Sequence, residues 1–392
     1  MWYLLLGLGA FGLLASTVVA GIVLAAVPGY VRERTTAQWL TTRRSRPTPP
    51  VSLFKPLHGT EPGLAGYLAT FFKQDYPEYE ILFCAREASD TGLAIAREVA
   101  ARYPRIPAQF LVTNGQPDYI NDKVISLERM AAAAKYDIFV ISDSDVRVEP
   151  DYLRAVTLPF SEARVGAVTC PYRGVAAEGG LWARLEAVGM SVEMTAGVLA
   201  ARMVEGMQFV LGPTMAFRRE TIQAMGGFRV TAEYCADDFV LGNEAHKHGS
   251  TVILSHHAID HMVINSGFIS TVKHQVRWMK STRFSRPAGH FGTALTFSIP
   301  FGIAAGAAAA ALGHPGWGLG LLAWSVFTRL VLALAVGRLV VRDESWFGLL
   351  VLYPIRDLMG FCFWAASYLS SRILWRGHVY RLLPGGKMQA AD

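Results

Sequence analysis

The feature that most constrains the fold is a long apolar segment at the start of the chain, because residues 2–27 contain no charged side chain. The segment is longer than a signal-peptide core, and it has neither a basic start nor a convincing small-residue cleavage site. Its length is sufficient for a helix to cross the hydrocarbon core of a bilayer. We therefore expect residues 1–31 to form a retained N-terminal transmembrane anchor.

A basic patch follows this segment, and Glu33 is its only opposing charge. The patch consists of Arg32, Arg34, Arg43, Arg44 and Arg46. Basic residues beside a membrane helix favour the cytoplasmic side, so the N-terminus is expected outside and residues 32–290 inside. Nucleic-acid binding is the alternative, but no basic stripe interleaved with aromatic residues supports it, and we expect no nucleic-acid partner. Residues 32–50 are predicted to be a basic, proline-rich linker.

The second apolar region lies in the C-terminal third. The whole chain is 52% hydrophobic and 17% charged, and its charges are sparse between residues 291 and 371. Apolar stretches at 293–312, 317–341 and 346–371 predict a C-terminal membrane region, followed by a basic tail at 372–392. Three spans would place the tail outside, whereas its basic residues favour inside, so one stretch being re-entrant or interfacial stays open. Arg329, Arg356 and Asp357 within these stretches are expected to pair with one another or to face lipid head groups.

The middle of the chain has an ordinary soluble composition and is long enough for one α/β domain, which we place at 51–290. Short β-type runs occur at 51–54, 80–84, 108–113, 137–142, 165–170 and 251–254, and alanine-rich helical stretches at 92–102 and 126–136. This alternation predicts βαβ units and a mostly parallel sheet. No glycine-rich dinucleotide fingerprint or P-loop follows a strand. The four cysteines are far apart, which excludes a disulfide framework and a zinc ribbon.

The strongest local signal is the buried-type run 138–142 followed by Asp143, Ser144 and Asp145. Ligands of such sheets bind beyond the carboxyl ends of the strands. Two carboxylates there could hold a Mg²⁺ or Mn²⁺ ion together with phosphate oxygens, which predicts a nucleotide-diphosphate site. An ordinary turn after the strand is the alternative.

Several further motifs follow in order along the chain. Asp90 ends the loop after the second run, Asp237 and Asp238 precede an apolar segment, and Arg277-Trp278 close a helical stretch. With the aspartates of 143–145, this order resembles that of inverting family 2/21-type glycosyltransferases, and more closely the ceramide glucosyltransferase-like family, which includes bacterial glycosyltransferases of hopanoid biosynthesis. Further similar segments are Phe54-Lys55-Pro56-Leu57, Phe71-Phe72 with Asp75-Tyr76-Pro77, Asn121-Asp122-Lys123, and Tyr380-Arg381-Leu382 with Gly385-Gly386. One departure is His274, which stands where the family has Gln or Arg three residues before Arg277, with Gln275 one place late.

The resemblance implies a GT-A (Rossmann-like) domain that moves a hexose from a UDP-sugar to a lipid hydroxyl with inversion. Its partners would be a UDP-sugar donor, a membrane lipid acceptor and the bilayer, and its location a bacterial inner membrane, with several spans and a cytoplasmic catalytic domain. Transfer of glucose from UDP-glucose to ceramide is the first expectation. The alternatives are an N-acetylglucosaminyltransferase acting on a hopanoid such as bacteriohopanetetrol, a processive polysaccharide synthase, and a non-catalytic membrane scaffold.

The resemblance also implies roles for individual residues. Asp238 would be the catalytic base, with its pKa raised by Asp237, and Asp143 and Asp145 would hold a divalent cation. The remaining residues would bind substrate: Asp90 the uridine, Lys55 and Lys123 the phosphates or donor, His274 and Arg277 the diphosphate, and Trp278 the acceptor. The alternatives are a helix N-cap for Asp238, an exposed turn for Asp90, a surface ion pair for Arg277, packing for Trp278 and solvation for the lysines.

Two other features have a functional and a structural interpretation. His256, His257 and His261 match no established zinc spacing, and we expect them to be polar loop or core residues. The methionine-rich stretch 187–207 is expected to be a core helix, with an interfacial helix that feeds a lipid acceptor to the site as the alternative.

Overall fold

The computed structural model describes residues 1–42, 48–264, 267–375 and 377–391, so Arg43, Arg44 and Arg46 of the basic patch lie outside the described residues. The chain forms two compact units. The sheet unit contains Arg32–Tyr172 and Met207–Ile264. The helical unit contains Met1–Val31, Arg173–Gly206 and Asn265–Asp392. Each unit is described by itself, and the domain boundaries expected above stay predictions.

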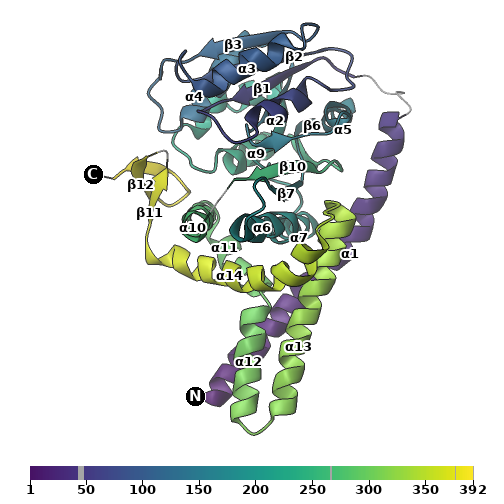
Figure 1. The fold of residues 1–392 in the computed structure, drawn as a ribbon, viewed down its shortest axis with the longest axis vertical. Coiled ribbons are helices and arrows are strands. Elements are labelled where there is room, and N and C mark those ends of the chain that lie inside the picture. Colours follow the sequence, from purple (N-terminus) through teal and green to yellow (C-terminus); the bar gives the residue numbers. More distant parts are fainter. Residues whose placement is uncertain (43–47, 265–266, 376, 392) are drawn as a thin grey trace. The chain divides into compact units, whose positions relative to one another are not determined.

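The sheet unit has, within its described residues, a seven-stranded sheet in the order β3-β2-β1-β4-β8-β6-β9 (Figure 1). Its strands are β1 Val51–Pro56, β2 Tyr79–Ala85, β3 Ala108–Val112, β4 Ile138–Ser142, β6 Val165–Thr169, β8 Thr214–Arg218 and β9 Thr251–Leu254. The first four in this order are parallel, β8 is antiparallel to β4 and to β6, and β6 is parallel to β9. The expected mostly parallel α/β sheet is confirmed, whereas β8 was not expected.

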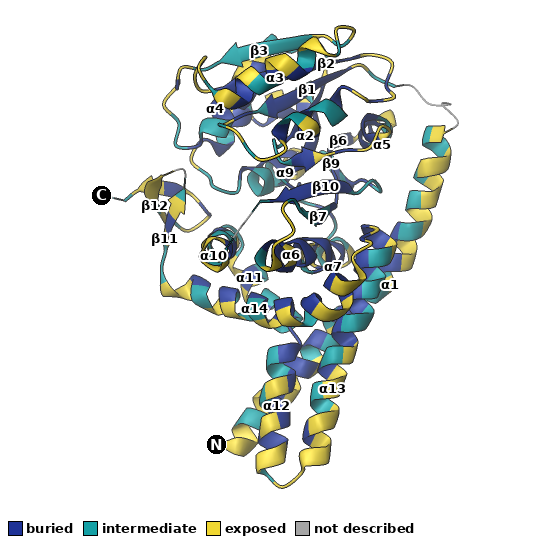
Figure 2. Ribbon diagram, in the orientation of Figure 1, coloured by how far each residue is buried: buried dark blue, intermediate teal, exposed yellow. Residues whose placement is uncertain are grey.

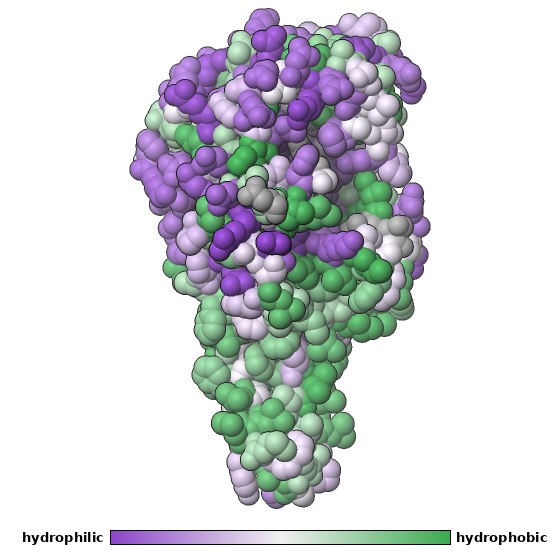
Figure 3. Space-filling model, turned by 90° about the vertical axis from the view of Figure 1, so that its left-hand side faces the viewer, coloured by the Kyte–Doolittle hydropathy of each residue, from purple (hydrophilic) through white to green (hydrophobic). Residues whose placement is uncertain are grey.

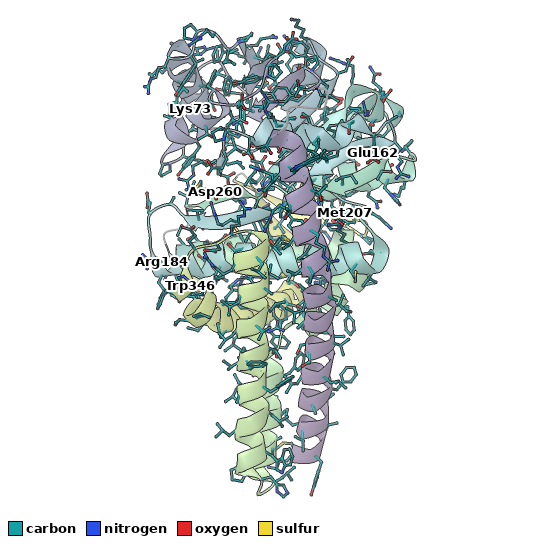
Figure 4. All side chains as sticks on the ribbon, turned by 90° about the vertical axis from the view of Figure 1, so that its right-hand side faces the viewer. Lys73, Glu162, Arg184, Met207, Asp260 and Trp346 are labelled. Atoms are coloured by element: carbon teal, nitrogen blue, oxygen red, sulfur yellow. The ribbon has the colours of Figure 1, made fainter. Side chains whose placement is uncertain are left out.

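Helices and short strands complete this unit. They are α2 Leu64–Phe71, α3 Thr91–Ala101, α4 Asp122–Ala133, α5 Tyr152–Thr157, η1 Leu158–Ser161, α8 Arg219–Ala224, η3 Phe228–Thr231 and α9 Asp237–Lys247. β5 Val146–Arg147 pairs antiparallel with β10 Ile259–Val263, where Asp260 (Figure 4) accepts from Arg147 at 2.7 Å. All residues of β2 and β4 are buried, which is the pattern of strands covered on both faces. The sheet therefore brings the ends of β1 and β4 to one edge.

The helical unit begins with the part of α1 (Trp2–Thr42) up to Val31 and resumes within β7 (Tyr172–Ala176). Its other elements are α6 Leu181–Val188, the π-helix η2 Gly189–Met194, α7 Thr195–Glu205, α10 Phe268–Ser285, α11 Pro287–Thr293, η4 Ala294–Thr296, α12 Ile299–Ala311, α13 Pro315–Leu332, η5 Ala333–Val340, η6 Gly348–Leu352, α14 Tyr353–Ala366, η7 Ser367–Leu369, β11 Arg372–Trp375, β12 His378–Leu382 and β13 Met388–Ala390. β11, β12 and β13 form an antiparallel sheet.

Close packing joins α1 to the hairpin of α12 and α13. A Cβ atom at Gly9 would lie 2.6 Å from the backbone nitrogen of Ala305, and the indole of Trp324 donates to Thr17 at 3.1 Å. The surface of this bundle is largely exposed and hydrophobic (Figures 2 and 3). Four of the described helices are long and apolar enough to cross a membrane: Trp2–Thr42, Leu181–Glu205, Pro315–Val340 and Gly348–Leu369. A fifth candidate is the pair Pro287–Thr296 and Ile299–Ala311, which is bent by 53°.

The methionine-rich stretch is partly a core helix, as expected, and its role as an interfacial helix stays a prediction. Val198 and Leu199 of α7 are buried, whereas Met203 and Val204 near its end are exposed. The stretch thus has a core face and an apolar exposed end.

Candidate functional site

Neighbouring strands β1 and β4 supply the first groups of the site, because their carboxyl ends lie at the same edge of the sheet. Lys55, near the end of β1, is fully buried, and its Nζ donates to the backbone carbonyl of Asp143 and lies 3.8 Å from the centre of the Phe71 ring. Burial lowers the pKa of Lys55 to about 7, although the nearby carboxylates act in the opposite direction. The hydrogen bond of Lys55 therefore connects the end of β1 with the loop after β4.

Asp143 and Asp145, which follow β4, have different partners. Asp143 Oδ1 lies 2.8 Å from Lys123 Nζ, and Asp145 Oδ2 lies 3.0 Å from His261 Nε2. Burial raises the pKa of Asp143. Burial acts in the same direction on Asp145, but His261, Lys55 and a backbone hydrogen bond together lower the pKa of Asp145. Asp145 Oδ1 is buried and has no hydrogen-bond partner among the described residues. Such an atom normally has a partner, so it leaves a coordination position for a ligand.

Lys123 joins the loop after β4 to the start of α9. Its Nζ lies 2.8 Å from Asp143 Oδ1 and 3.4 Å from Asp237 Oδ2, and these carboxylates raise the pKa of Lys123 against the effect of its burial. The fully buried Asn121 caps α4, because its Oδ1 accepts from the backbone N–H of Lys123 at 3.1 Å. The cap fixes the lysine between the two carboxylates.

Asp238 lies in the first turn of α9, after the N-cap residue Ala236, so the N-cap alternative for Asp238 is wrong. Its two oxygens accept from the backbone N–H groups of Gly212 and Phe239, each at 2.8 Å. Burial, and then the charge of Asp237, raise the pKa of Asp238 to about 6. A Cβ atom at Gly212 would lie 3.2 Å from Asp238 Oδ2 and 3.6 Å from Asp143 Oδ2, so both carboxylates approach this glycine.

Asp90 is the N-cap of α3. Its Oδ1 accepts from Leu93 N at 3.1 Å, and its Oδ2 from Gly59 N at 2.9 Å. The exposed-turn alternative is therefore wrong, because both oxygens bind backbone groups of two segments. Among the described residues, the hydrogen bonds and ion pairs of Asp90 do not join it to the aspartates at 143, 145 and 238.

Three of the expected substrate-binding residues, His274, Arg277 and Trp278, lie on α10 in the helical unit. His274 Nδ1 lies 2.6 Å from Oε1 of the buried Glu186, and its ring centre lies 4.6 Å from that of Trp278. Gln275 is buried and accepts from Arg356 Nη2 at 2.7 Å. The sheet unit thus gathers the carboxylates and lysines, and α10 carries the remaining candidates.

The histidines singled out in the sequence have separate partners. His256 Nε2 lies 2.8 Å from Glu33 Oε2, His257 Nδ1 lies 3.6 Å from Asp151 Oδ1, and His261 faces Asp145. No group of three or more His, Cys, Asp or Glu side chains among the described residues has an arrangement that could hold a metal ion. A cation at Asp143 and Asp145 would therefore need ligands from a bound phosphate or from water, which is the usual state of Mg²⁺ in nucleotide sites.

Comparison with known proteins identifies the family. The family model described as Glycosyl transferase family 21 matches residues 14–388. The chain belongs to glycosyl transferase family 21. It is a ceramide glucosyltransferase-like member and a sugar-transferring enzyme.

The relatives of this family 21 chain include ceramide glucosyltransferases. Ceramide glucosyltransferase 1 of Caenorhabditis elegans is 24% identical over 350 residues, which are 88% of this chain and 74% of that protein. The ceramide glucosyltransferase of Komagataella phaffii is 32% identical over 147 residues, 36% of this chain and 29% of that protein. Among solved structures, the mannosyltransferase PcManGT from Pyrobaculum calidifontis, in complex with GDP-Man and Mn²⁺, has a TM-score of 0.48 and 17% identity, covering 88% of this chain and 99% of that chain.

The structure adds residues to the candidate site that no sequence motif assigned to it. Glu61 Oε2 accepts from Ser144 Oγ at 3.3 Å, and burial, followed by the charge of Asp145, raises the pKa of Glu61 to about 7. His261 and Gly212 also belong here, through Asp145 and Asp238. These three residues lie in no recognisable motif, and only the fold brings them to the edge of the sheet.

Proposed function

We propose that this family 21 enzyme is a GT-A-type transferase that moves a hexose from a UDP-sugar to a lipid hydroxyl with inversion, with UDP-glucose and ceramide as donor and acceptor. The observation that carries the proposal is that Asp238, whose pKa is raised to about 6, and Asp143 both approach Gly212, with Asp145 two residues further along the loop after β4. The ceramide glucosyltransferases among its relatives support the choice of substrates.

In the proposed reaction, Asp238 accepts the proton of the acceptor hydroxyl while the hydroxyl oxygen attacks the anomeric carbon. The bond from that carbon to the diphosphate oxygen breaks, and UDP leaves with the electron pair. A carboxylate whose pKa lies near the working pH suits this role. Inversion follows because the acceptor attacks from the face opposite the leaving group.

The proposed cation ligands are Asp143 and Asp145. The unpartnered Oδ1 of Asp145 and the oxygen-only donors of the pair fit Mg²⁺ or Mn²⁺. When bound, such an ion supplies positive charge that stabilises the diphosphate leaving group. Lys123 and Lys55 add positive charge at the same edge, and we propose them, with Asp90, Asp237, His274, Arg277 and Trp278, as substrate-binding residues.

The proposed location is the membrane, with several spans and the sheet unit in the cytoplasm. This location is supported by the candidate spans, which include the uncharged start of the chain and three further helices of the helical unit. The acceptor would then lie in the bilayer, and the donor in the aqueous phase.

The test is product analysis with purified enzyme in lipid nanodiscs. UDP-glucose and UDP-N-acetylglucosamine are each offered with ceramide and with bacteriohopanetetrol, and the products are identified by mass spectrometry and their anomeric configuration by NMR. We expect glucosylceramide of inverted configuration, at least a hundredfold less of it with Asp238→Asn, and wild-type amounts with the control Asp137→Asn, whose side chain is 85% exposed. Retention of configuration, or unchanged turnover with Asp238→Asn, would refute the proposal. If product formed only with bacteriohopanetetrol, the acceptor would be a hopanoid and not ceramide.

A further inference from the structure

The segment Gly348–Leu369, made of η6, α14 and η7, has an orientation different from that of its neighbours. α12 and α13 form an antiparallel hairpin, and α14 runs across their axes (Figure 1). Length and composition alone make this segment a candidate span. A helix that lies across a membrane-crossing hairpin would instead lie along the membrane plane.

Apart from Leu350 and Tyr368, the exposed residues of this segment form one narrow apolar stripe. They recur at alternating intervals of four and three residues, which places them on a single helix face. The stripe consists of Val351, Ile355, Leu358, Cys362, Ala365 and Leu369. Because an amphipathic helix in water exposes its polar face, this stripe suits contact with acyl chains.

The charged residues of the segment lie on its opposite face, packed against protein. Asp357 Oδ2 accepts from the backbone N–H groups of Ser298 at 2.9 Å and Ile299 at 2.8 Å, at the start of α12. Arg356 donates to Gln275 of α10 at 2.7 Å, and both charged side chains are at most 4% exposed. Only one side of the segment is therefore available to lipid, as in a helix embedded from the side.

The length of α12 agrees with this arrangement. α12 has 13 residues and is therefore about 20 Å long, whereas the hydrocarbon core of a bilayer is about 30 Å thick. A helix lying flat adds about 10 Å, its own diameter. The short α12 and the flat segment together match the thickness of the hydrocarbon core.

Charges at the end of the segment indicate which surface it meets. In the tail sheet, Arg372 lies directly opposite Arg381, and both are exposed. Like charges at directly opposed positions destabilise an antiparallel pair, unless an anion lies against them. Leu374 and Val379, the exposed pair next to them, add apolar contact. Phosphate head groups beside acyl chains match both pairs.

We propose that Gly348–Leu369 lies in the plane of the cytoplasmic leaflet, with its apolar stripe in the acyl region and the β11–β12 hairpin on anionic head groups. α1, α12 and α13 then cross the bilayer, and the tail returns to the side on which residue 32 emerges. The inference rests on the proposed membrane insertion and is independent of the sugar-transfer reaction. It accounts for the basic tail without a fourth crossing.

Depth measurements test the orientation. All variants carry Cys235→Ser. A bimane label is placed either on the native Cys362 or, in a Cys362→Ser background, on a cysteine that replaces Val351, Ile355 or Leu358. Full-length protein in vesicles is then quenched by lipids carrying a nitroxide at a shallow or a deep carbon. We expect the same shallow-to-deep quenching ratio at all four positions. Labels replacing Leu319 and Phe327 of α13 serve as controls and should differ, being about 12 Å apart along the helix. A ratio that changes steadily from 351 to 362 would overturn the proposal.

Sidedness gives an independent test. Cysteines replacing Gln389 in the tail, Arg102 in the sheet unit and Gly316 at the hairpin tip are treated with an impermeant maleimide in sealed vesicles. We expect 389 and 102 to react from one side and 316 from the other. Reaction of 389 together with 316 would show a fourth crossing.

The head-group contact has a test of its own. A label at 389 is quenched by head-group nitroxides in anionic vesicles, and we expect the double variant Arg372→Glu, Arg381→Glu to lower this quenching at least twofold. Unchanged quenching would refute the contact. No readout requires turnover, so an inactive enzyme would count only against the proposed function.

Discussion

At the scale of single residues, the carboxylates of the site differ in their partners. Asp143 faces the ammonium group of Lys123 and Asp145 the imidazole of His261, whereas both oxygens of Asp238 accept from backbone N–H groups. Backbone donors hold a carboxylate in place without supplying a full positive charge. Burial and Asp237 can therefore raise the pKa of Asp238, while the pKa of Asp145 is lowered. These contacts fit the different roles proposed for the three carboxylates.

The pH profile should report the state of Asp238. A protonated carboxyl cannot accept the acceptor's proton, so on the acid side kcat/KM should fall towards tenfold per pH unit below about pH 6. Initial rates at low UDP-sugar and saturating lipid, between pH 4.5 and 8, measure kcat/KM for the donor. A flat profile down to pH 5 would contradict the assignment of the base.

Gly212 offers a steric test of the same carboxylate. In Gly212→Ala the new methyl group would lie 3.2 Å from Asp238 Oδ2 and displace it. We expect at least a tenfold lower kcat with little change in the melting temperature, measured by turnover and by differential scanning fluorimetry. Gly66→Ala is the control, because its Cβ would meet nothing within 4 Å. Wild-type kcat in Gly212→Ala would mean that Asp238 need not occupy this position.

At the scale of elements, Asp90 combines a cap with a proposed uridine contact. Asp90→Ala should destabilise the protein by about 1 kcal/mol, because α3 loses its N-cap. Asp90→Ser keeps a capping oxygen and should recover most of this stability, while KM for the UDP-sugar stays raised. Chemical denaturation and donor titration separate the two effects. Full recovery of KM in Asp90→Ser would leave Asp90 with only its structural role.

Which elements could be predicted depends on how local their signal is. The parallel strands β1, β2 and β4 are buried apolar runs, and Asp143 and Asp145 directly follow β4, so their location at the sheet edge was predictable. β8 is a five-residue strand whose position between β4 and β6 depends on long-range pairing. Glu61 contacts Ser144 from a loop, and His261 contacts Asp145 from β10, and both residues are distant in sequence from their partners. No local pattern marks such residues.

At the scale of the whole molecule, the charge of Lys123 predicts that activity depends on a metal ion and that folding does not. Its ammonium group already neutralises part of the charge of Asp143 and Asp237. We expect EDTA to reduce sugar transfer at least a hundredfold and Mg²⁺ or Mn²⁺ to restore it, while the melting temperature changes by less than about 2 °C. Turnover and differential scanning fluorimetry of the same samples check this. Full activity in EDTA would exclude the proposed cation, and a large loss of melting temperature would show that folding depends on it.

The order in which the chain enters its two units limits how the enzyme can be divided. The chain passes from the helical unit to the sheet unit and back twice, so the sheet unit consists of two separate segments. A fragment covering 51–290 would keep α6, α7 and α10 but lose α14, which covers Gln275. A shortened form for work in water would thus need residues 173–206 replaced by a short linker and an end near residue 264. Within the described residues, no single cut separates the sheet unit from the candidate spans.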